Sequence, residues 1–322
     1  MEFVILTKKE FDDFSSNYKD KCYLQSSNIA EFRKTQGWHT EYVGVKENKK
    51  VLAATLLLSK KRHIKKEFYT LRGPQLDYTN KKLLSFFMTE LKKHVKNNNG
   101  YFLRIDPYIE VKSLDKDGKE TGIFDNSNII KNLKDLGFIE VESKQMTDTV
   151  QAKFMYVIDL EDNLNDTMAE MDSKTRQMIR KNEKQGVVIR VGDKNDVELF
   201  EDIMNQTSQR RKFNDRGLTF YKNMYEALIK DNMISLVFAE LDINLARENL
   251  KSEQKEIELA RKDREEKRKL GKCNEKKAKQ KEAEEEKALE RISKKKAELA
   301  ELEEKYGNKI TLGGILYILY GD

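Results

Sequence analysis

The chain has 322 residues, of which 38% are hydrophobic and 37% charged, and its formal net charge is +6. This length allows about two globular domains. The only cysteines, Cys22 and Cys273, exclude a disulfide framework and a cysteine-based metal site. The mild basic excess suits an anionic partner such as tRNA, a nucleotide sugar or an anionic lipid surface, but it is too small to identify one.

The sequence contains none of the common cofactor or membrane signals. No run approaches the ~18 apolar residues of a membrane span, and acidic residues interrupt the N-terminus too early for a signal peptide. We therefore expect a soluble, cytoplasmic protein. Glycine-rich nucleotide loops, zinc-protease motifs and a nucleophile elbow are absent, and the three histidines show no ligand spacing. We expect no cofactor, no metal and no catalytic nucleophile.

Taken in order, the first part of the chain alternates β-rich runs with amphipathic segments, as in an α/β domain. Thr7 is the expected N-cap of the first helix, and Gly137 is expected to end the last one. Strands are expected at 1–6, 41–45, 50–58, 67–71 and 100–105, and helices at 7–18, 28–35, 80–97 and 126–136.

A second unit with a similar opening order follows. Strands are expected at 154–160, 187–191, 233–241 and 310–320, and helices at 164–171, 173–185, 193–207 and 221–230.

A charged segment at 241–308 separates the last two of these strands. It has no proline, and its only glycines are Gly271 and Gly307. Apolar residues recur every seven positions on both sides of a short turn at 271–274, which predicts an antiparallel coiled-coil arm inserted into a globular domain. These residues are Ile243, Leu250 and Ile257, then Ile292, Leu299 and Tyr306. Residues 242–306 hold 20 basic and 18 acidic side chains, so the arm alone does not account for the net charge.

A cationic ridge is expected on the helix at 173–185. Arg176, Arg180 and Lys184 are spaced four residues apart and would share one helix face. Such a ridge can neutralise phosphates, and Arg offers bidentate contacts. The alternative interpretation is an ordinary solvated helix face.

A second cationic segment is the loop between the helices at 193–207 and 221–230. It combines Arg216 with Phe220 and Tyr221, a pairing that suits a phosphate or carboxylate with ring stacking on a sugar or base. The alternative is a capping loop whose aromatic side chains anchor the core. Arg33 and Lys34, close before Trp38, give a weaker signal, for which a surface helix is the simpler explanation.

Several motifs in consistent order resemble the Fem family of peptidoglycan interpeptide-bridge aminoacyltransferases, most closely its staphylococcal members. The resemblance covers essentially the whole chain. Its motifs are Leu24-Gln25 with Gly37-Trp38, Arg72-Gly73-Pro74 with Asp77-Tyr78, Ile105-Asp106-Pro107, Leu136-Gly137-Phe138, the segments 176–186 and 207–221, and the arm followed by Gly313-Gly314.

The resemblance implies an α/β (α+β) fold of two acetyltransferase-like (GNAT) subdomains, with the coiled-coil arm inserted in the second. The expected domains are a first subdomain at 1–150, a second beginning at 151–241, the arm at 242–308, and a continuation of the second at 309–322. Because the family's second subdomain is longer, we expect the subdomain to be incomplete here at its C-terminal end.

The resemblance also implies an activity and a site. Members transfer an amino acid from aminoacyl-tRNA, here most simply glycine and otherwise serine or alanine, to the stem-peptide lysine or the growing bridge of a lipid-linked or UDP-linked muropeptide precursor. This would place the protein in the cytoplasm at the inner membrane face. The substrate contacts fall on Arg33 or Lys34, on Arg216, and on Phe220, where the family commonly has tyrosine, with Tyr221 adjacent; the tRNA contacts fall on Arg176, Arg180 and Lys184. The alternative function is a non-catalytic protein that binds tRNA or precursor.

Overall fold

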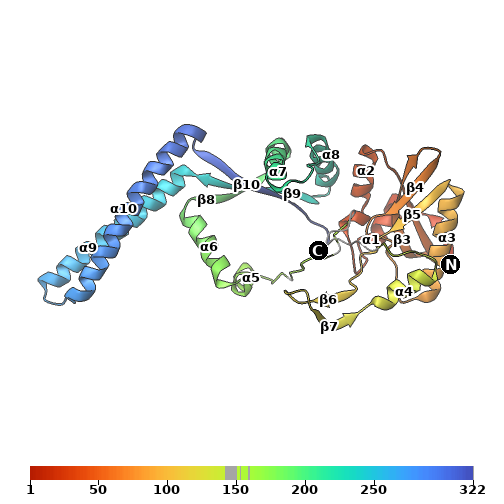
Figure 1. The fold of residues 1–322 in the computed structure, drawn as a ribbon, viewed down its shortest axis with the longest axis horizontal. Coiled ribbons are helices and arrows are strands. Elements are labelled where there is room, and N and C mark those ends of the chain that lie inside the picture. The colour runs from red at the N-terminus through yellow and green to blue at the C-terminus, as the bar shows by residue number, and fades with distance from the viewer. Residues whose placement is uncertain (142–150, 153, 159, 322) are drawn as a thin grey trace. The chain divides into compact units, whose positions relative to one another are not determined.

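The computed structural model describes residues 1–141, 151–152, 154–158 and 160–321. The chain forms two compact units, which are described separately. Unit 1 comprises Met1–Val157, Arg216–Ser235 and Ile318–Asp322, and unit 2 comprises Ile158–Asp215 and Leu236–Tyr317. Both contain helices and strands, which confirms the predicted α/β class (Figure 1). Residue 150, where the first predicted domain ends, lies outside the described residues.

Unit 1 is built on a five-stranded sheet in the order β1-β2-β3-β4-β5. The first four strands are antiparallel, whereas β4 and β5 run parallel. Residues 53–59 of β3 are buried without interruption, as expected for a central strand that is covered on both faces. The strands are β1 (Glu2–Ile5), β2 (His39–Glu47), β3 (Lys50–Arg62), β4 (Lys65–Thr70) and β5 (Gly100–Ile105).

The helices of unit 1 begin at recognisable caps. Thr7 forms a capping box with Glu10, which confirms its predicted role at the start of α1. Asn80 caps α3 by accepting a hydrogen bond from the Leu83 amide at 3.1 Å. Figure 1 shows α3 on one side of the five-stranded sheet and α2 on the other. The helices are α1 (Lys8–Ser15), η1 (Tyr23–Gln25), α2 (Ser27–Thr35), α3 (Lys81–Asn97), α4 (Ser127–Asp135) and α8 (Leu218–Ile229).

The main core of unit 1 lies between the sheet and α3. Phe87, Met88 and Leu91 of α3 are completely buried, and they belong to one cluster with Val43 and Phe68 of the sheet. Burying a side chain of this size contributes about 1.5–3 kcal/mol. This core fixes β4 and β5, on which the pocket described below is built.

Unit 2 contains a three-stranded sheet in the order β10-β9-β8. Phe238 of β9 is completely buried, and its ring contacts the backbone at Gly192 and Gly314 so closely that a side chain at either glycine would clash. The elements are α5 (Leu164–Glu170), α6 (Ser173–Lys184), β8 (Val187–Gly192), η2 (Lys194–Asp196), α7 (Val197–Arg211), β9 (Ile234–Asp242) and β10 (Lys309–Ile318).

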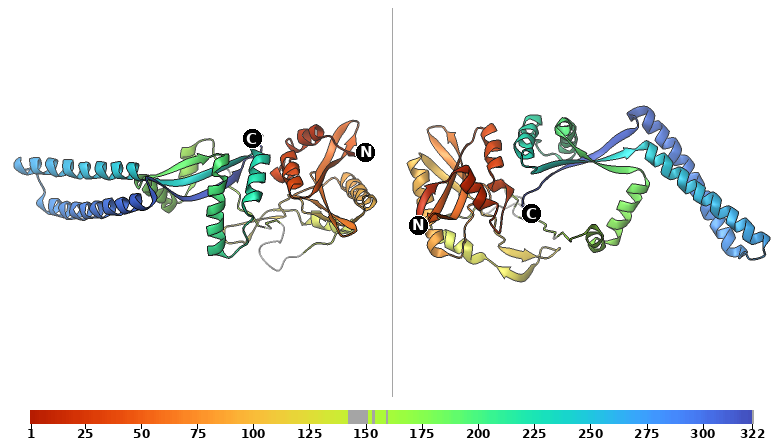
Figure 2. Two further views of the ribbon diagram at one scale, coloured as in Figure 1. Left: turned by 90° about the horizontal axis from the view of Figure 1, so that it is seen from above. Right: turned by 180° about the vertical axis from the view of Figure 1, so that it is seen from behind.

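The arm joins β9 to β10, which are neighbours in this sheet. It consists of α9 (Ile243–Lys269) and α10 (Glu275–Tyr306), which run side by side as the predicted hairpin (Figure 2). Asp242 caps α9 by accepting a hydrogen bond from the Leu245 amide at 3.0 Å. Ile243, Ile292 and Leu299 of the heptad repeat are buried, but Tyr306 is 55% exposed.

Two parts of the sequence-based prediction need correction. The strand predicted at 154–160 is wrong for the residues described there, which form no strand. Tyr156 in this run is 92% exposed. The described part of the run forms no strand, because an apolar segment becomes a strand only where a partner strand pairs with it. Conversely, the hairpin of β6 (Lys112–Leu114) and β7 (Glu120–Asp125) was not predicted. None of the described helices has both the length and the apolar character needed to cross a bilayer.

Candidate functional site

A pocket of about 340 Å³ lies over β3, β4 and β5 of unit 1, beside α2 and the start of α8. Its floor is apolar and aromatic, and four arginines reach it from different elements. The lining residues are Arg33, Trp38, Leu58, Arg62, Glu67, Phe68, Tyr69, Leu71, Phe102, Arg104, Gln151 and Arg216. With one carboxylate among them, the lining is cationic.

The parallel pairing of β4 with β5 places four of these side chains on one face. Glu67 pairs with Phe102 and Tyr69 with Arg104, and residues two apart on a strand point to the same side. Arg62 donates to Glu67 at 2.9 Å, so those two charges neutralise each other. The positive charge available to a ligand therefore resides on Arg33, Arg104 and Arg216.

Arg33 stands in the last turn of α2, a helix that Ser26 caps and that buries Ile29 and Phe32. Its Nη1 donates to Gln36 Oε1 at 2.7 Å. Its Nε is buried and has no hydrogen-bond partner within the described chain. Burial lowers the pKa of the Arg33 guanidinium, and the charge of Arg216 acts in the same direction. A partly buried guanidinium beside a like charge is stabilised by a bound anion.

Lys34 is positioned differently from its neighbour. Its side chain is exposed and pairs with Glu31 at 2.7 Å, one turn earlier on α2. It is not part of the pocket lining in the described residues. Of the two alternatives that the sequence left open, Arg33 is the one that lines this pocket.

Arg216 lines the pocket from the segment before α8. Its guanidinium lies 5.6 Å from the centre of the Phe220 ring, within reach of a cation–π interaction. Phe220 in turn packs edge-on against Phe32 of α2, with ring centroids 5.1 Å apart. Tyr221 is buried, and its ring lies 5.6 Å from that of Phe220. In the described chain, Phe220 and Tyr221 stand behind Arg216 and outside the pocket lining.

Asp106 supports the pocket from the end of β5. Its carboxylate accepts hydrogen bonds from the Tyr69 hydroxyl at 2.7 Å and from the Arg72 amide at 2.6 Å. Burial raises the pKa of Asp106 to about 6 and is also the main cause of a raised pKa at Tyr69. Asp106 thereby fixes the Tyr69 side chain on the pocket wall.

Gln25 provides a second support, deeper in unit 1. Its Oε1 accepts from the Leu56 amide at 2.8 Å and from Thr55 Oγ1 at 3.1 Å, and its Nε2 donates to the Leu71 carbonyl. Gly73 lies directly against this side chain: an added Cβ would come within 2.8 Å of Gln25 Cδ. Gln25 and Gly73, two residues of the family motifs, therefore belong to one buried contact.

The cationic ridge lies in unit 2, on α6. Arg176 Nη1 donates to the backbone carbonyls of Ala169 at 2.9 Å and of Met171. Its guanidinium thus caps the end of α5. Arg180 and Lys184 are exposed and make no ion pair among the described residues, so only these two present free charge on the ridge.

Sequence reasoning missed Arg62, Tyr69 and Arg104 as pocket residues. The signal for Arg104 was present, because it is the one charged residue in the strand Gly100–Ile105. Tyr69 and Arg62 carried no such signal, since their roles depend on the register of β4 with its neighbours.

The fold and the site together define an α/β protein with a cationic, aromatic-lined pocket and a helical arm inserted in its second unit. The chain belongs to the FemAB family, whose model matches residues 6–322. This confirms the resemblance found in the sequence at the level of the family.

Individual relatives agree with this assignment. The chain is 32% identical over 246 residues to "Aminoacyltransferase FemA" of Staphylococcus epidermidis, covering 75% of this chain and 59% of that protein. It is 31% identical over 267 residues to the protein of the same name from Staphylococcus aureus strain MRSA252, covering 82% of this chain and 62% of that protein. The chain thus spans about three fifths of the length of these relatives.

A solved structure, "Crystal structure of FemX", matches with a TM-score of 0.81 and 25% identity. The match covers 100% of this chain and 78% of the FemX chain.

Proposed function

We propose that this chain takes part in peptidoglycan interpeptide-bridge synthesis, by transferring an amino acid from aminoacyl-tRNA to the stem-peptide lysine or the growing bridge of a cell-wall precursor. The observation that carries the proposal is the pocket of unit 1, where Arg33 and Arg216 meet in a chain of the FemAB family. The names of the staphylococcal relatives support aminoacyl transfer as the reaction class.

The pyrophosphate of the precursor is the ligand group we assign to Arg33 and Arg216. Guanidinium groups bind phosphate oxygens through parallel, charge-assisted hydrogen bonds. Arg33 lines the pocket together with Arg216, and the exposed Arg216 offers its full guanidinium fork. Trp38 and Phe102 of the same lining supply apolar surface for the rest of the precursor.

The mechanism we assign needs no covalent intermediate. An aminoacyl ester is already activated, so the protein must hold a neutral amine against the ester carbonyl and stabilise the oxyanion that forms. Positioning and electrostatics can supply this, and we assign no residue as a nucleophile or as a general base. We propose no cofactor and no metal.

For the donor we propose Arg180 and Lys184 of α6 as phosphate contacts, since both are exposed. Arg176 is proposed only as the residue that holds α5 against α6, because its guanidinium already binds carbonyl groups. Glycyl-tRNA is the donor we test first, with seryl- and alanyl-tRNA as the alternatives. The reaction is assigned to the cytoplasmic side of the membrane, where these substrates meet.

The test is a transfer assay with the purified chain, radiolabelled glycyl-, seryl- and alanyl-tRNA, and lipid-linked or UDP-linked precursors with and without a first glycine. Product from one tRNA supports the enzyme and names its amino acid. Tight precursor binding without product, lost in Arg216→Ala, favours the alternative of a non-catalytic binding protein. If the chain neither forms product nor binds precursor, the proposal is refuted for this chain.

A further inference from the structure

The arm carries its positive charge almost entirely at one end. We define the arm tip as residues 267–281 and the arm shaft as residues 242–266 and 282–306. The tip holds eight basic residues and one acidic residue, whereas the shaft holds 12 basic and 17 acidic residues. A near-neutral arm is therefore a cationic tip on an anionic shaft.

The charge of the tip is exposed and largely uncompensated. Lys267 pairs with Asp263, and Arg268 with Glu275 and Glu282. The remaining six cations make no ion pair within the part of the chain that the structure describes, and all are exposed. They are Lys269, Lys272, Lys276, Lys277, Lys279 and Lys281.

One apolar side chain, Leu270, is exposed among the lysines of the arm tip. Leu270 ends α9 at the turn and is 67% exposed. The tip contains no aromatic residue, and seven of its eight cations are lysines.

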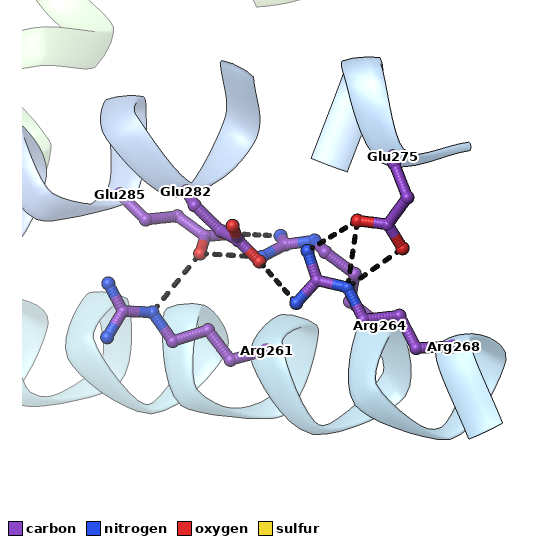
Figure 3. A network of polar contacts seen from close by, with 6 residues as sticks. All are labelled: Arg261, Arg264, Arg268, Glu275, Glu282 and Glu285. Atoms are coloured by element: carbon purple, nitrogen blue, oxygen red, sulfur yellow. Dashed lines mark hydrogen bonds and ion pairs between the residues drawn. The ribbon is translucent and has the colours of Figure 1, made fainter. Parts of the chain in front are cut away.

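A network of ion pairs holds the two helices together directly beside the tip. Arg264 is 8% exposed and contacts Glu285 through both terminal nitrogens. Figure 3 shows how the arginines of α9 face the glutamates of α10; the members are Arg261, Arg264, Arg268, Glu275, Glu282 and Glu285. The network keeps the turn and its lysines at the end of a defined helical pair.

We propose that the arm tip docks on the surface of an anionic phospholipid bilayer. Clusters of four to eight basic residues on a helical segment bind anionic headgroups, with about 1 kcal/mol from each Lys or Arg near the surface. Leu270 adds an apolar contact at the headgroup level. This docking is independent of the activity proposed above.

The distribution of charge favours a bilayer over RNA as the partner. A folded RNA in contact with the arm would extend along the shaft, whose net negative charge repels a polyanion. The tip also lacks the aromatic side chains on which unpaired bases stack. A flat bilayer touches the tip alone, and the same repulsion then keeps the shaft away from the lipid surface.

The test measures partition of the full chain onto sedimented vesicles in about 0.1 M salt. One set of vesicles contains phosphatidylglycerol and phosphatidylcholine, the other phosphatidylcholine alone, and neither contains a cell-wall precursor. The tip variant carries Lys269→Gln, Lys272→Gln, Lys276→Gln and Lys277→Gln. The matched shaft variant carries Lys251→Gln, Lys255→Gln, Lys262→Gln and Lys287→Gln, which removes the same charge from exposed positions.

We expect binding of the unaltered chain to the anionic vesicles only. Each tip lysine should contribute about five-fold to the partition coefficient, so the tip variant should bind several hundred-fold more weakly, on the order of 600-fold, while the shaft variant stays within about three-fold. Equal losses in the two variants, or equal binding to both sets of vesicles, would overturn the proposal. So would a tRNA transcript that binds through the tip lysines while the anionic vesicles do not. Circular dichroism checks that both variants keep the helical content of the arm.

Discussion

Arg33 at the end of α2 and Arg216 before α8 line one pocket of unit 1, although they lie far apart in the sequence. The link between them is aromatic. Phe32, next to Arg33, packs edge-on against Phe220, and Arg216 stacks over that same Phe220 ring. Packing of α2 on α8 thus brings two guanidinium groups to one place, where an anion relieves their repulsion.

Replacing either arginine should weaken binding of a pyrophosphate-bearing precursor. Hydrogen bonds to charged groups contribute about 1.5–3 kcal/mol, so Arg33→Ala and Arg216→Ala should each raise the Kd by about ten- to a hundred-fold. Isothermal titration with a UDP-linked precursor measures this. Lys34→Ala is the matched control, because Lys34 pairs with Glu31 outside the pocket lining, and it should leave the Kd unchanged. A larger effect at Lys34 than at Arg33 would reverse the assignment.

Gly73→Ala should destabilise unit 1. The new Cβ would lie 2.6 Å from Thr55 Oγ1 and 2.8 Å from Gln25 Cδ, in a contact where both partners are buried and hydrogen-bonded. Overpacking of this kind costs about 1–3 kcal/mol. Urea unfolding followed by circular dichroism measures the loss. Gly313→Ala is the control, because no atom lies within 4 Å of its added Cβ, and it should be nearly neutral.

Local sequence signals were sufficient for most elements and for the arm. The capping box at Thr7 and the heptad spacing of Ile292 and Leu299 act within one or two turns of helix, so they can be read without the fold. The run at 154–160 shows the limit of such reading. Its apolar pattern matched a strand, yet no partner strand pairs with the residues described there.

The candidate site was only partly predictable for the same reason. Arg216 and Phe220 stood out as a cation beside aromatic residues. Arg62 and Tyr69 reach the pocket only through the register of β4 with β3 and β5, which no local pattern encodes. Arg176 shows the converse: its spacing fitted a phosphate ridge, but tertiary structure directs it to the carbonyls that end α5.

Asp106 should make unit 1 less stable as the pH rises from about 4 to about 6. Its native pKa of about 6 lies above the ordinary value near 3.9, so the native state holds the proton longer than the unfolded chain. Above pH 6 both states are ionised, and the lost stability reaches about 3 kcal/mol. Fluorescence of Trp38, the only tryptophan, can follow urea unfolding across this range.

Asp106→Asn should flatten that pH dependence. Asp77→Asn provides the contrast, because hydrogen bonds from Thr79 lower the pKa of Asp77, and its replacement removes stability that grows with pH. An unchanged slope between pH 4 and 6 in Asp106→Asn would contradict the assignment of this proton to Asp106.

Glu285 should make the outer part of the arm sensitive to acid. The hydrogen bonds from Arg264 lower its pKa, followed by those from Arg261, so its contribution to stability is present above its ordinary pKa near 4.3 and is lost as the pH falls below that value. Helicity of the arm, followed by circular dichroism, should therefore decrease below about pH 4. Glu285→Gln should weaken this transition and lower the thermal midpoint already at pH 7, because Arg264 would remain buried with a neutral partner. Glu290→Gln, which removes only an exposed pair with Lys294 on the same helix, should change the midpoint little. Equal thermal midpoints for Glu285→Gln and Glu290→Gln would show that the ion-pair network is an incidental surface feature. Only a pair shielded from water would make the packing of α9 on α10 depend on the charge of Glu285.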